Sequence, residues 1–145
     1  MLLTPALADS PQDKLFPDAT RCYARSYSAD HLAQHPAQRV TQLRLSPDFR
    51  IGKPLLVLKV DLSLRGTPGG PFEGYGYCET KGDDTLYCGI EGDGGGFTVT
   101  PARNGAILLT VSSLGMSFEN AAGFVTLDRE TGDDRSFMLR PSPCD

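Results

Sequence analysis

Residues 55–65 read LLVLKVDLSLR, and this stretch decides the fold class. Every second residue from Leu56 to Leu64 is apolar, and the positions between them become polar from Lys59 onward. A period of two is that of a β-strand with one buried face and one solvated face. Strands of this kind are typical of antiparallel sheets, because parallel strands are usually buried on both faces. The stretch therefore predicts an antiparallel β protein.

Turn signals divide the rest of the chain into further short strands. One strand is expected over residues 40–45, where Pro47 closes it. The other expected strands cover residues 72–80, 85–91, 97–100, 106–111, 116–119, 124–129 and 136–140. Asn104 and Gly105 predict a hairpin because both residues tolerate the positive φ of a type I′ turn. Eight or nine linked strands predict an up-and-down meander that forms a barrel or a sandwich, and pairing between sequence neighbours favours the barrel.

The chain before these strands is expected to contain little regular structure. Residues 9–27 show no clear period and are predicted to be irregular. A helix of barely two turns follows at residues 29–34, with Ser28 as its N-cap. Pro36 disfavours helix at the residue before it and ends the element.

The four cysteines predict two disulfides. If residues 82–84 form a three-residue loop, Cys78 lies directly opposite Cys88 on the two arms of one hairpin. Cys22 and Cys144 remain near the two ends of the chain. Four cysteines allow three pairings, and hairpin geometry favours Cys22–Cys144 together with Cys78–Cys88.

Composition and the N-terminus indicate an exported single domain. The chain has 145 residues, a length that fits one domain, and a net charge of −4. Residues 1–8, MLLTPALA, are apolar and uncharged, and Ala6 and Ala8 have the spacing of a signal-peptidase site. We therefore expect a signal-peptide remnant at 1–8, a mature β domain at 9–145, and a periplasmic or secreted protein. No apolar run approaches the ~20 residues of a membrane span, and scattered basic residues argue against a nucleic-acid partner.

No motif predicts catalysis, a metal or a cofactor. His31 and His35 are four residues apart, but no motif places a third ligand beside them, so we interpret them as incidental surface histidines. Residues 92–96 read GDGGG, yet a phosphate-binding loop is followed by a helix and this one precedes an expected strand. The chain has no G-x-S-x-G motif, and its cysteines are expected to be bridged. We therefore expect a protein that is not an enzyme and needs no cofactor.

Three tyrosines have two interpretations. Tyr75, Tyr77 and Tyr87 lie on neighbouring expected strands, and Gly74 and Gly76 alternate with the first two. The tyrosines could form a binding surface or the lip of a cavity. Alternatively, they cover the core where the glycines allow the barrel to curve.

Three functional hypotheses remain open. The first is a non-enzymatic, inhibitor-like or accessory protein that binds an envelope or extracellular protein through loops on a rigid scaffold. The second is a carrier with an apolar ligand inside the barrel. The third is a hydrolase with an unrecognised pair of carboxylates. In general character the chain resembles small secreted lysozyme or protease inhibitors of bacterial envelopes, although it contains no motif specific to them.

The expected binding surface follows from chain order. In an up-and-down meander every second loop emerges at the same end, so the loops at 66–71, 92–96 and 130–135 should share one rim. Glycines in these loops expose backbone groups, and aspartates would steer a cationic partner toward them. The residues predicted to bind are Gly69, Gly70, Asp93, Gly94, Gly95, Asp133 and Asp134.

Overall fold

A computed structural model describes residues 10–50, 55–67, 70–82, 84–130 and 132–144. The expected signal-peptide remnant at residues 1–8 lies outside these ranges. The helical elements are α1 (Pro11–Leu15), α2 (Ala29–Gln34) and the short turn η1 (Arg103–Gly105). The strands are β1 (Arg21–Ser26), β2 (Val40–Asp48), β3 (Leu56–Leu64), β4 (Phe72–Lys81), β5 (Thr85–Ile90), β6 (Gly95–Pro101), β7 (Ile107–Asn120), β8 (Gly123–Leu127) and β9 (Ser136–Pro143). In these ranges no helix combines the length and the hydropathy that a membrane crossing requires.

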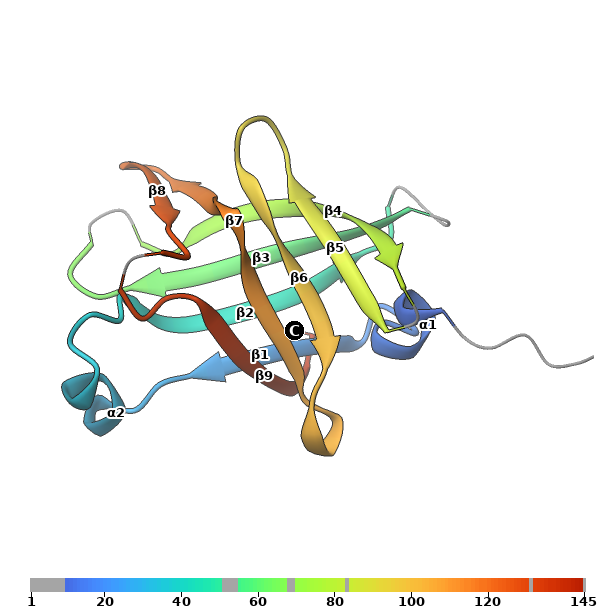
Figure 1. The fold of residues 1–145 in the computed structure, drawn as a ribbon, viewed down its shortest axis with the longest axis horizontal. Helices are drawn as coiled ribbons and strands as arrows, with labels where there is room; N and C mark the ends of the chain where they lie inside the picture. Colours follow the sequence, from blue (N-terminus) through green and yellow to red (C-terminus); the bar gives the residue numbers. More distant parts are fainter. Residues whose placement is uncertain (1–9, 51–54, 68–69, 83, 131, 145) are drawn as a thin grey trace, which may run out of the picture.

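Eight strands close into an antiparallel barrel, which confirms the predicted fold class. Strands β1 to β6 pair in sequence order, β6 pairs with β7, and β9 pairs with both β7 and β1 to complete the ring (Figure 1). Strand β8 stands outside the ring and, among the strands of the described residues, pairs only with β7. The chain is thus a meander up to β7, and its last hairpin projects from the wall.

Strand β7 explains why β8 lies outside the ring. The two strands expected at residues 106–111 and 116–119 are parts of this one strand of 14 residues. Its first part pairs with β6 and β9, and its second part pairs with β8. Between the two parts the chain bulges, because Val111 lies opposite Phe97 while Met116 lies opposite Gly95. The Ser112 hydroxyl donates to the Gly115 carbonyl at 3.0 Å and holds the bulge.

Side chains fill the inside of the barrel. The alternate residues of β3 that the sequence pattern marks as apolar are all buried: Leu56, Leu58, Val60, Leu62 and Leu64. Rings from other strands complete the core, among them Phe97 and Phe137. Gly76 leaves room for one of these rings, since a Cβ there would lie 3.0 Å from two carbons of Phe97. Each such leucine stabilises the fold by about 1.5–3 kcal/mol, an upper estimate.

Both predicted disulfides are present. Cys78 lies opposite Cys88 on β4 and β5, in the expected register, and the two are bonded. The bond between Cys22 and Cys144 ties β1 to the end of the chain just after β9. The Asn-Gly hairpin is also confirmed: Asn104 and Gly105 have φ values of 57° and 77°.

The N-terminal region differs from the sequence-based expectation. The prediction that residues 9–27 are irregular is wrong, because α1 and β1 lie there. Helix α1 begins after Ser10, whose hydroxyl accepts a hydrogen bond from the Asp13 N–H at 3.2 Å. Strand β1 shows no alternating sequence pattern. It is ordered because it pairs on both sides, with β2 and with β9. Strand β2 also continues to Asp48, past the predicted stop at Pro47. Helix α2 matches its predicted range and cap.

Candidate functional site: the rim of the barrel

The loops expected to share a rim do emerge at one end of the barrel. Antiparallel order sends the connections after β1, β3, β5 and β7 to the same end, from α2 at the lower left of Figure 1 to the β5–β6 loop at its top. The segment that leads into β9 also lies at this end, because β9 is antiparallel to both β1 and β7. Contacts tie them together there. The Asn120 side-chain amide donates to the Gly70 carbonyl at 3.0 Å, and the Ser117 N–H donates to the Gly94 carbonyl at 2.9 Å. Gly69, one of the residues predicted to bind, lies outside the described residues.

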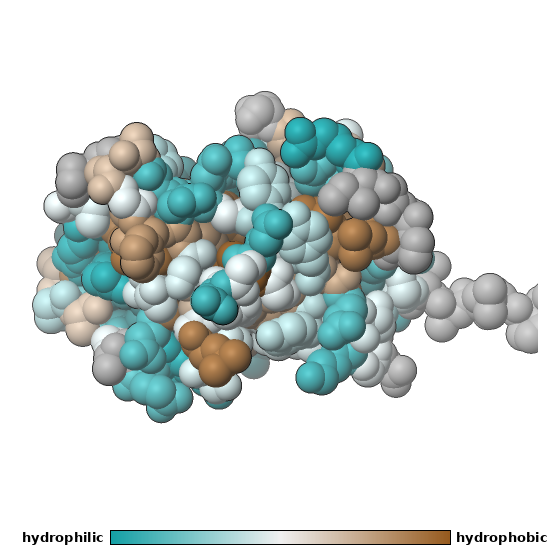
Figure 2. Space-filling view, turned by 90° about the horizontal axis from the view of Figure 1, so that it is seen from above, coloured by the Kyte–Doolittle hydropathy of each residue, from teal (hydrophilic) through white to brown (hydrophobic). Residues whose placement is uncertain are grey.

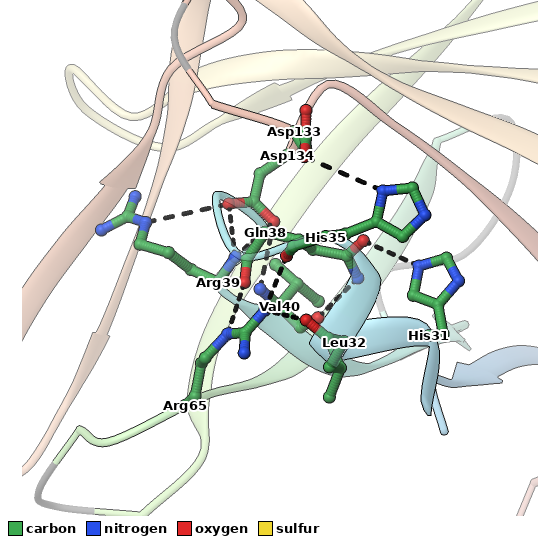
Figure 3. A network of polar contacts seen from close by, with 9 residues as sticks. All are labelled: His31, Leu32, His35, Gln38, Arg39, Val40, Arg65, Asp133 and Asp134. Atoms are coloured by element: carbon green, nitrogen blue, oxygen red, sulfur yellow. Dashed lines mark hydrogen bonds and ion pairs between the residues drawn. The ribbon is translucent and has the colours of Figure 1, made fainter. Parts of the chain in front are cut away.

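Asp134 is the buried acid of this rim. Only 3% of its surface is exposed. Its carboxylate accepts the backbone N–H of Arg39 at 2.9 Å and that of Val40 at 3.0 Å, and the Arg39 Nε lies 3.8 Å away (Figure 3). These bonds fasten the loop before β9 to the start of β2, which we call the Asp134 latch. Asp134 was predicted to bind a partner, but its carboxylate is enclosed and engaged within the protein.

Helix α2 packs beside the latch through polar contacts. The Arg65 guanidinium donates to the Leu32, His35 and Gln38 carbonyls at 2.6–3.0 Å and thereby caps the helix end. The ring of His31 stacks on that of His35 with centroids 4.3 Å apart, and the His35 Nδ1 lies 3.9 Å from an exposed Asp133 carboxylate oxygen. In the described ranges no group of three acidic, histidine or cysteine side chains could hold a metal ion.

Three of the four glycines in the GDGGG stretch, Gly94, Gly95 and Gly96, allow close packing. Gly94 is buried against Ile90, and a Cβ at Gly95 would overlap the Gly115 carbonyl oxygen. Gly95 also has a φ of 69°, which disfavours any other residue. Gly94 and Gly95 were predicted to offer backbone to a partner, yet the Gly94 carbonyl already accepts the Ser117 N–H and Gly95 lies against the Gly115 carbonyl. Asp93, in contrast, is exposed at the tip of the loop.

A hollow of about 460 Å³ opens beside this loop, and we call it the acidic groove. It lies between β4, the loop after β5 and the β7–β8 hairpin. Four carboxylates line it, from Glu73, Glu91, Asp93 and Glu119, and no basic side chain is part of its described lining. Apolar groups from Ile90 and other residues form the rest of the walls and floor.

Two of these carboxylates belong to residues that face each other. Glu73 on β4 and Glu119 on β7 are direct partners across the only pairing between these strands in the described structure. Directly opposed like charges destabilise a sheet pair. The Lys59 ammonium compensates in part, since it lies 3.5 Å from Glu73 and 3.6 Å from Asp61. Asp61, with a smaller contribution from Glu73, raises the pKa of Lys59.

An exposed aromatic ring borders the groove. Phe124 on β8 is 79% exposed and lies directly opposite Glu119. Figure 2, which looks onto the upper side of Figure 1, shows brown apolar patches set among teal hydrophilic residues. An exposed ring next to carboxylates suits a partner that carries both apolar and positively charged groups.

The tyrosines fit neither sequence-based interpretation completely. Tyr75 lines the acidic groove, and Tyr77 is exposed on the outer surface of the barrel. The intervening Gly74 and Gly76 lie under the rings of Phe118 and Phe97, which cover the core in place of the tyrosines.

Sequence reasoning missed three residues of the groove: Glu73, Glu119 and Phe124. Glu73 and Glu119 are 46 positions apart, and no local pattern indicates that β7 reaches β4. The one available signal was Phe124, an apolar residue next to a Gly-containing turn on a strand with little alternation.

Comparisons with family models, curated proteins and solved structures found no match to this chain.

Proposed function

We propose that this is a non-enzymatic binding protein that holds a cationic segment of an envelope or extracellular protein in the acidic groove. The observation that carries the proposal is the pairing of Glu73 with Glu119 in a hollow that Glu91 and Asp93 also line. A Lys or Arg side chain placed there would relieve the repulsion between like charges. It would also form charge-assisted hydrogen bonds with these carboxylates.

Electrostatics supports a cationic partner over a neutral one. The chain carries a net charge of −4, so its field attracts positive molecules at a distance. Four carboxylates around one hollow focus that field at the groove. The association rate should consequently fall as salt concentration rises.

The other two hypotheses gain no support from the structure. A carrier needs interior space, and the inward positions of the barrel hold buried side chains such as Phe97 and Phe137. A two-carboxylate hydrolase needs one carboxyl in surroundings that keep it protonated, usually an apolar pocket. Glu73 and Glu119 are both exposed to solvent.

A secreted or periplasmic location is part of the proposal. The two disulfides support it, because structural disulfides persist in oxidising compartments and are rare in the cytosol.

The proposal is tested by titrating a fluorescent eight-lysine peptide into the protein and measuring fluorescence anisotropy at low salt. The variant carries Asp93→Lys and Glu119→Lys, which reverse two charges of the groove. We expect its Kd to rise about tenfold or more, because each lost contact involves a charged pair.

A matched control carries Glu79→Lys and Asp84→Lys. Both residues are exposed on the β4–β5 hairpin, at the other end of the barrel, and the change in net charge is the same. We expect this control to raise Kd only about two- to threefold through the overall field. Equal weakening in the two variants would show that the peptide responds to net charge alone and would overturn the groove as the site.

A further inference from the structure

Strand β8 has a free edge. It pairs with β7 on one side, and no other strand of the described structure pairs with it. The Ser117 N–H on β7 donates to Gly94, on the side away from β8. Ser117 and its partner Thr126 are therefore a pair without hydrogen bonds between them, and in antiparallel strands such pairs alternate with bonded ones. The backbone groups of Thr126 and Phe124 consequently point outward from the hairpin.

Three of these outward groups are available. The Thr126 carbonyl accepts the Arg39 Nη2 at 2.7 Å, which supports the outward direction derived from Ser117. The N–H and C=O of Phe124 and the N–H of Thr126 have no hydrogen-bond partner among the described residues. Unpaired backbone groups on an exposed edge are a template for another strand.

The two faces of β8 differ in character. On the outer face Phe124 stands beside Glu119 at the border of the acidic groove. A second hollow of about 210 Å³ has Val125 and Phe72 among its lining residues, and Phe124 borders this hollow as well as the acidic groove. Side chains alternate between faces along a strand. A strand beside β8 would therefore place every second side chain near carboxylates and the others near an apolar hollow.

We propose that an extended segment of the cationic partner adds to the free edge of β8 as an antiparallel strand, with basic side chains outward and apolar side chains inward. This inference rests on the proposed function and specifies the conformation and side-chain pattern of the partner. Adjacent strands lie about 4.8 Å apart. A Lys or Arg opposite Phe124 can thus lie along that ring and bring its charge to Glu119 on the next strand. Cation–π contact with the ring adds to the attraction.

Charge argues against a second copy of this chain as the occupant. Two β8 edges paired with each other would bring the acidic grooves of two molecules together, each molecule carrying a net charge of −4. A separate basic segment meets no such repulsion.

The experiment uses a nine-residue peptide of alternating lysine and valine and the full protein. In antiparallel addition, the peptide residues directly opposite Phe124 and Thr126 have their side chains on the same outer face, and these positions are the lysines. The lysine N–H groups therefore point to β8, and the valine N–H groups point to solvent. One peptide is N-methylated on its lysines and another on its valines, with equal charge and composition. We expect lysine methylation to weaken binding by about tenfold or more, and valine methylation by about twofold or less.

The protein side of the experiment compares Thr126→Pro with Thr126→Val. Proline removes the outward N–H without touching the bonds between β7 and β8, and edge strands tolerate it. Both variants lose the hydroxyl contact between Thr126 and Ser117, so valine is the matched control. We expect Thr126→Pro to bind the unmethylated peptide at least about fivefold more weakly than Thr126→Val.

Two outcomes would overturn strand addition. One is equal binding of the two methylated peptides, which remains decisive even if Thr126→Pro does not fold. The other is a concentration-dependent dimer in sedimentation that Thr126→Pro abolishes, since a second copy would then occupy the edge. Neither outcome bears on the proposal that the acidic groove binds a cationic segment, because the charge-reversal variants and the eight-lysine peptide test that proposal separately.

Discussion

The rim contains two groups of acidic residues that behave in opposite ways. At the Asp134 latch a single carboxylate is buried and accepts two backbone N–H groups, with a guanidinium nearby. In the acidic groove four carboxylates are open to solvent, and two of them, on Glu73 and Glu119, belong to directly opposed residues. The latch satisfies its charge within the chain, whereas the groove keeps most of its charge unsatisfied.

This difference separates a structural acid from acids that are suited to binding. A buried carboxylate must be bonded within the fold, because an unpaired buried charge costs several kcal/mol. Exposed like charges cost only a few tenths of a kcal/mol each in stability, so a fold can retain them for a partner. Removing an acid should therefore lower the free energy of unfolding at the Asp134 latch and raise it in the acidic groove.

The largest expected effect is that of Asp134→Ala. The substitution leaves the Arg39 and Val40 N–H groups without their acceptor, and Val40 is fully buried. The free energy of unfolding should fall by about 2–4 kcal/mol, measured by urea denaturation. Asp133→Ala is the control, because that carboxylate is exposed and 3.9 Å from His35, and it should change stability by less than about 0.5 kcal/mol. Similar losses for the two neighbours would refute the latch.

The second effect concerns how the wall of the groove is held. The wall depends on backbone packing at Gly95, and Gly95→Ala would introduce both backbone strain and an overlap with the Gly115 carbonyl. We expect a loss of about 2–3 kcal/mol in urea denaturation. Gly92→Ala has a similar φ of 73° but open space around it, so it should lose only about 1 kcal/mol. If the two substitutions cost the same, close packing does not fix the wall.

The third effect has the opposite sign. Glu119→Gln removes one of two opposed charges and should raise the free energy of unfolding by about 0.2–0.5 kcal/mol at low salt. The gain should shrink in roughly 0.5 M sodium chloride, where exposed charges are screened. Glu79→Gln, at an exposed position opposite Tyr87, should show no such gain. A destabilised Glu119→Gln protein would mean that this carboxylate has a structural role like that of Asp134.

The smallest effect is that of Lys59→Gln, which removes the cation beside Glu73. Asp61, and to a lesser extent Glu73, raise the pKa of Lys59, so its charged form stabilises the fold. This contribution is complete below the unfolded-state pKa of about 10.4 and is lost as pH rises through the higher folded-state pKa. The variant should be less stable than the wild type by at most about 0.5 kcal/mol at pH 7, and the gap should close as pH rises through the raised folded-state pKa of Lys59.

The same variant should bind the eight-lysine peptide about two- to threefold more tightly, because Glu73 is no longer partly neutralised. Lys14→Gln, at an exposed position on α1, makes the same change in net charge and serves as the control. Unaltered affinity in Lys59→Gln would indicate that Glu73 does not take part in binding.

Local sequence patterns were enough to predict several individual elements of this protein. The period-2 pattern over residues 55–65 identified β3, and Ser28 with Pro36 bounded α2. The turn expected between Lys81 and Thr85 predicted the register that joins Cys78 to Cys88. Each of these features depends on residues close together in the chain, where side-chain alternation, capping and turn chemistry act directly.

The composition of the rim, in contrast, depends on contacts between segments that are distant in the sequence. Strand β1 owes its order to two neighbours distant in sequence, and Asp134 is buried because the loop before β9 folds onto the start of β2. Glu73 and Glu119 meet because β7 continues past its bulge beyond the start of β6. Barrel closure sets these meetings through the combined twist and register of many strands, and no local segment carries that information.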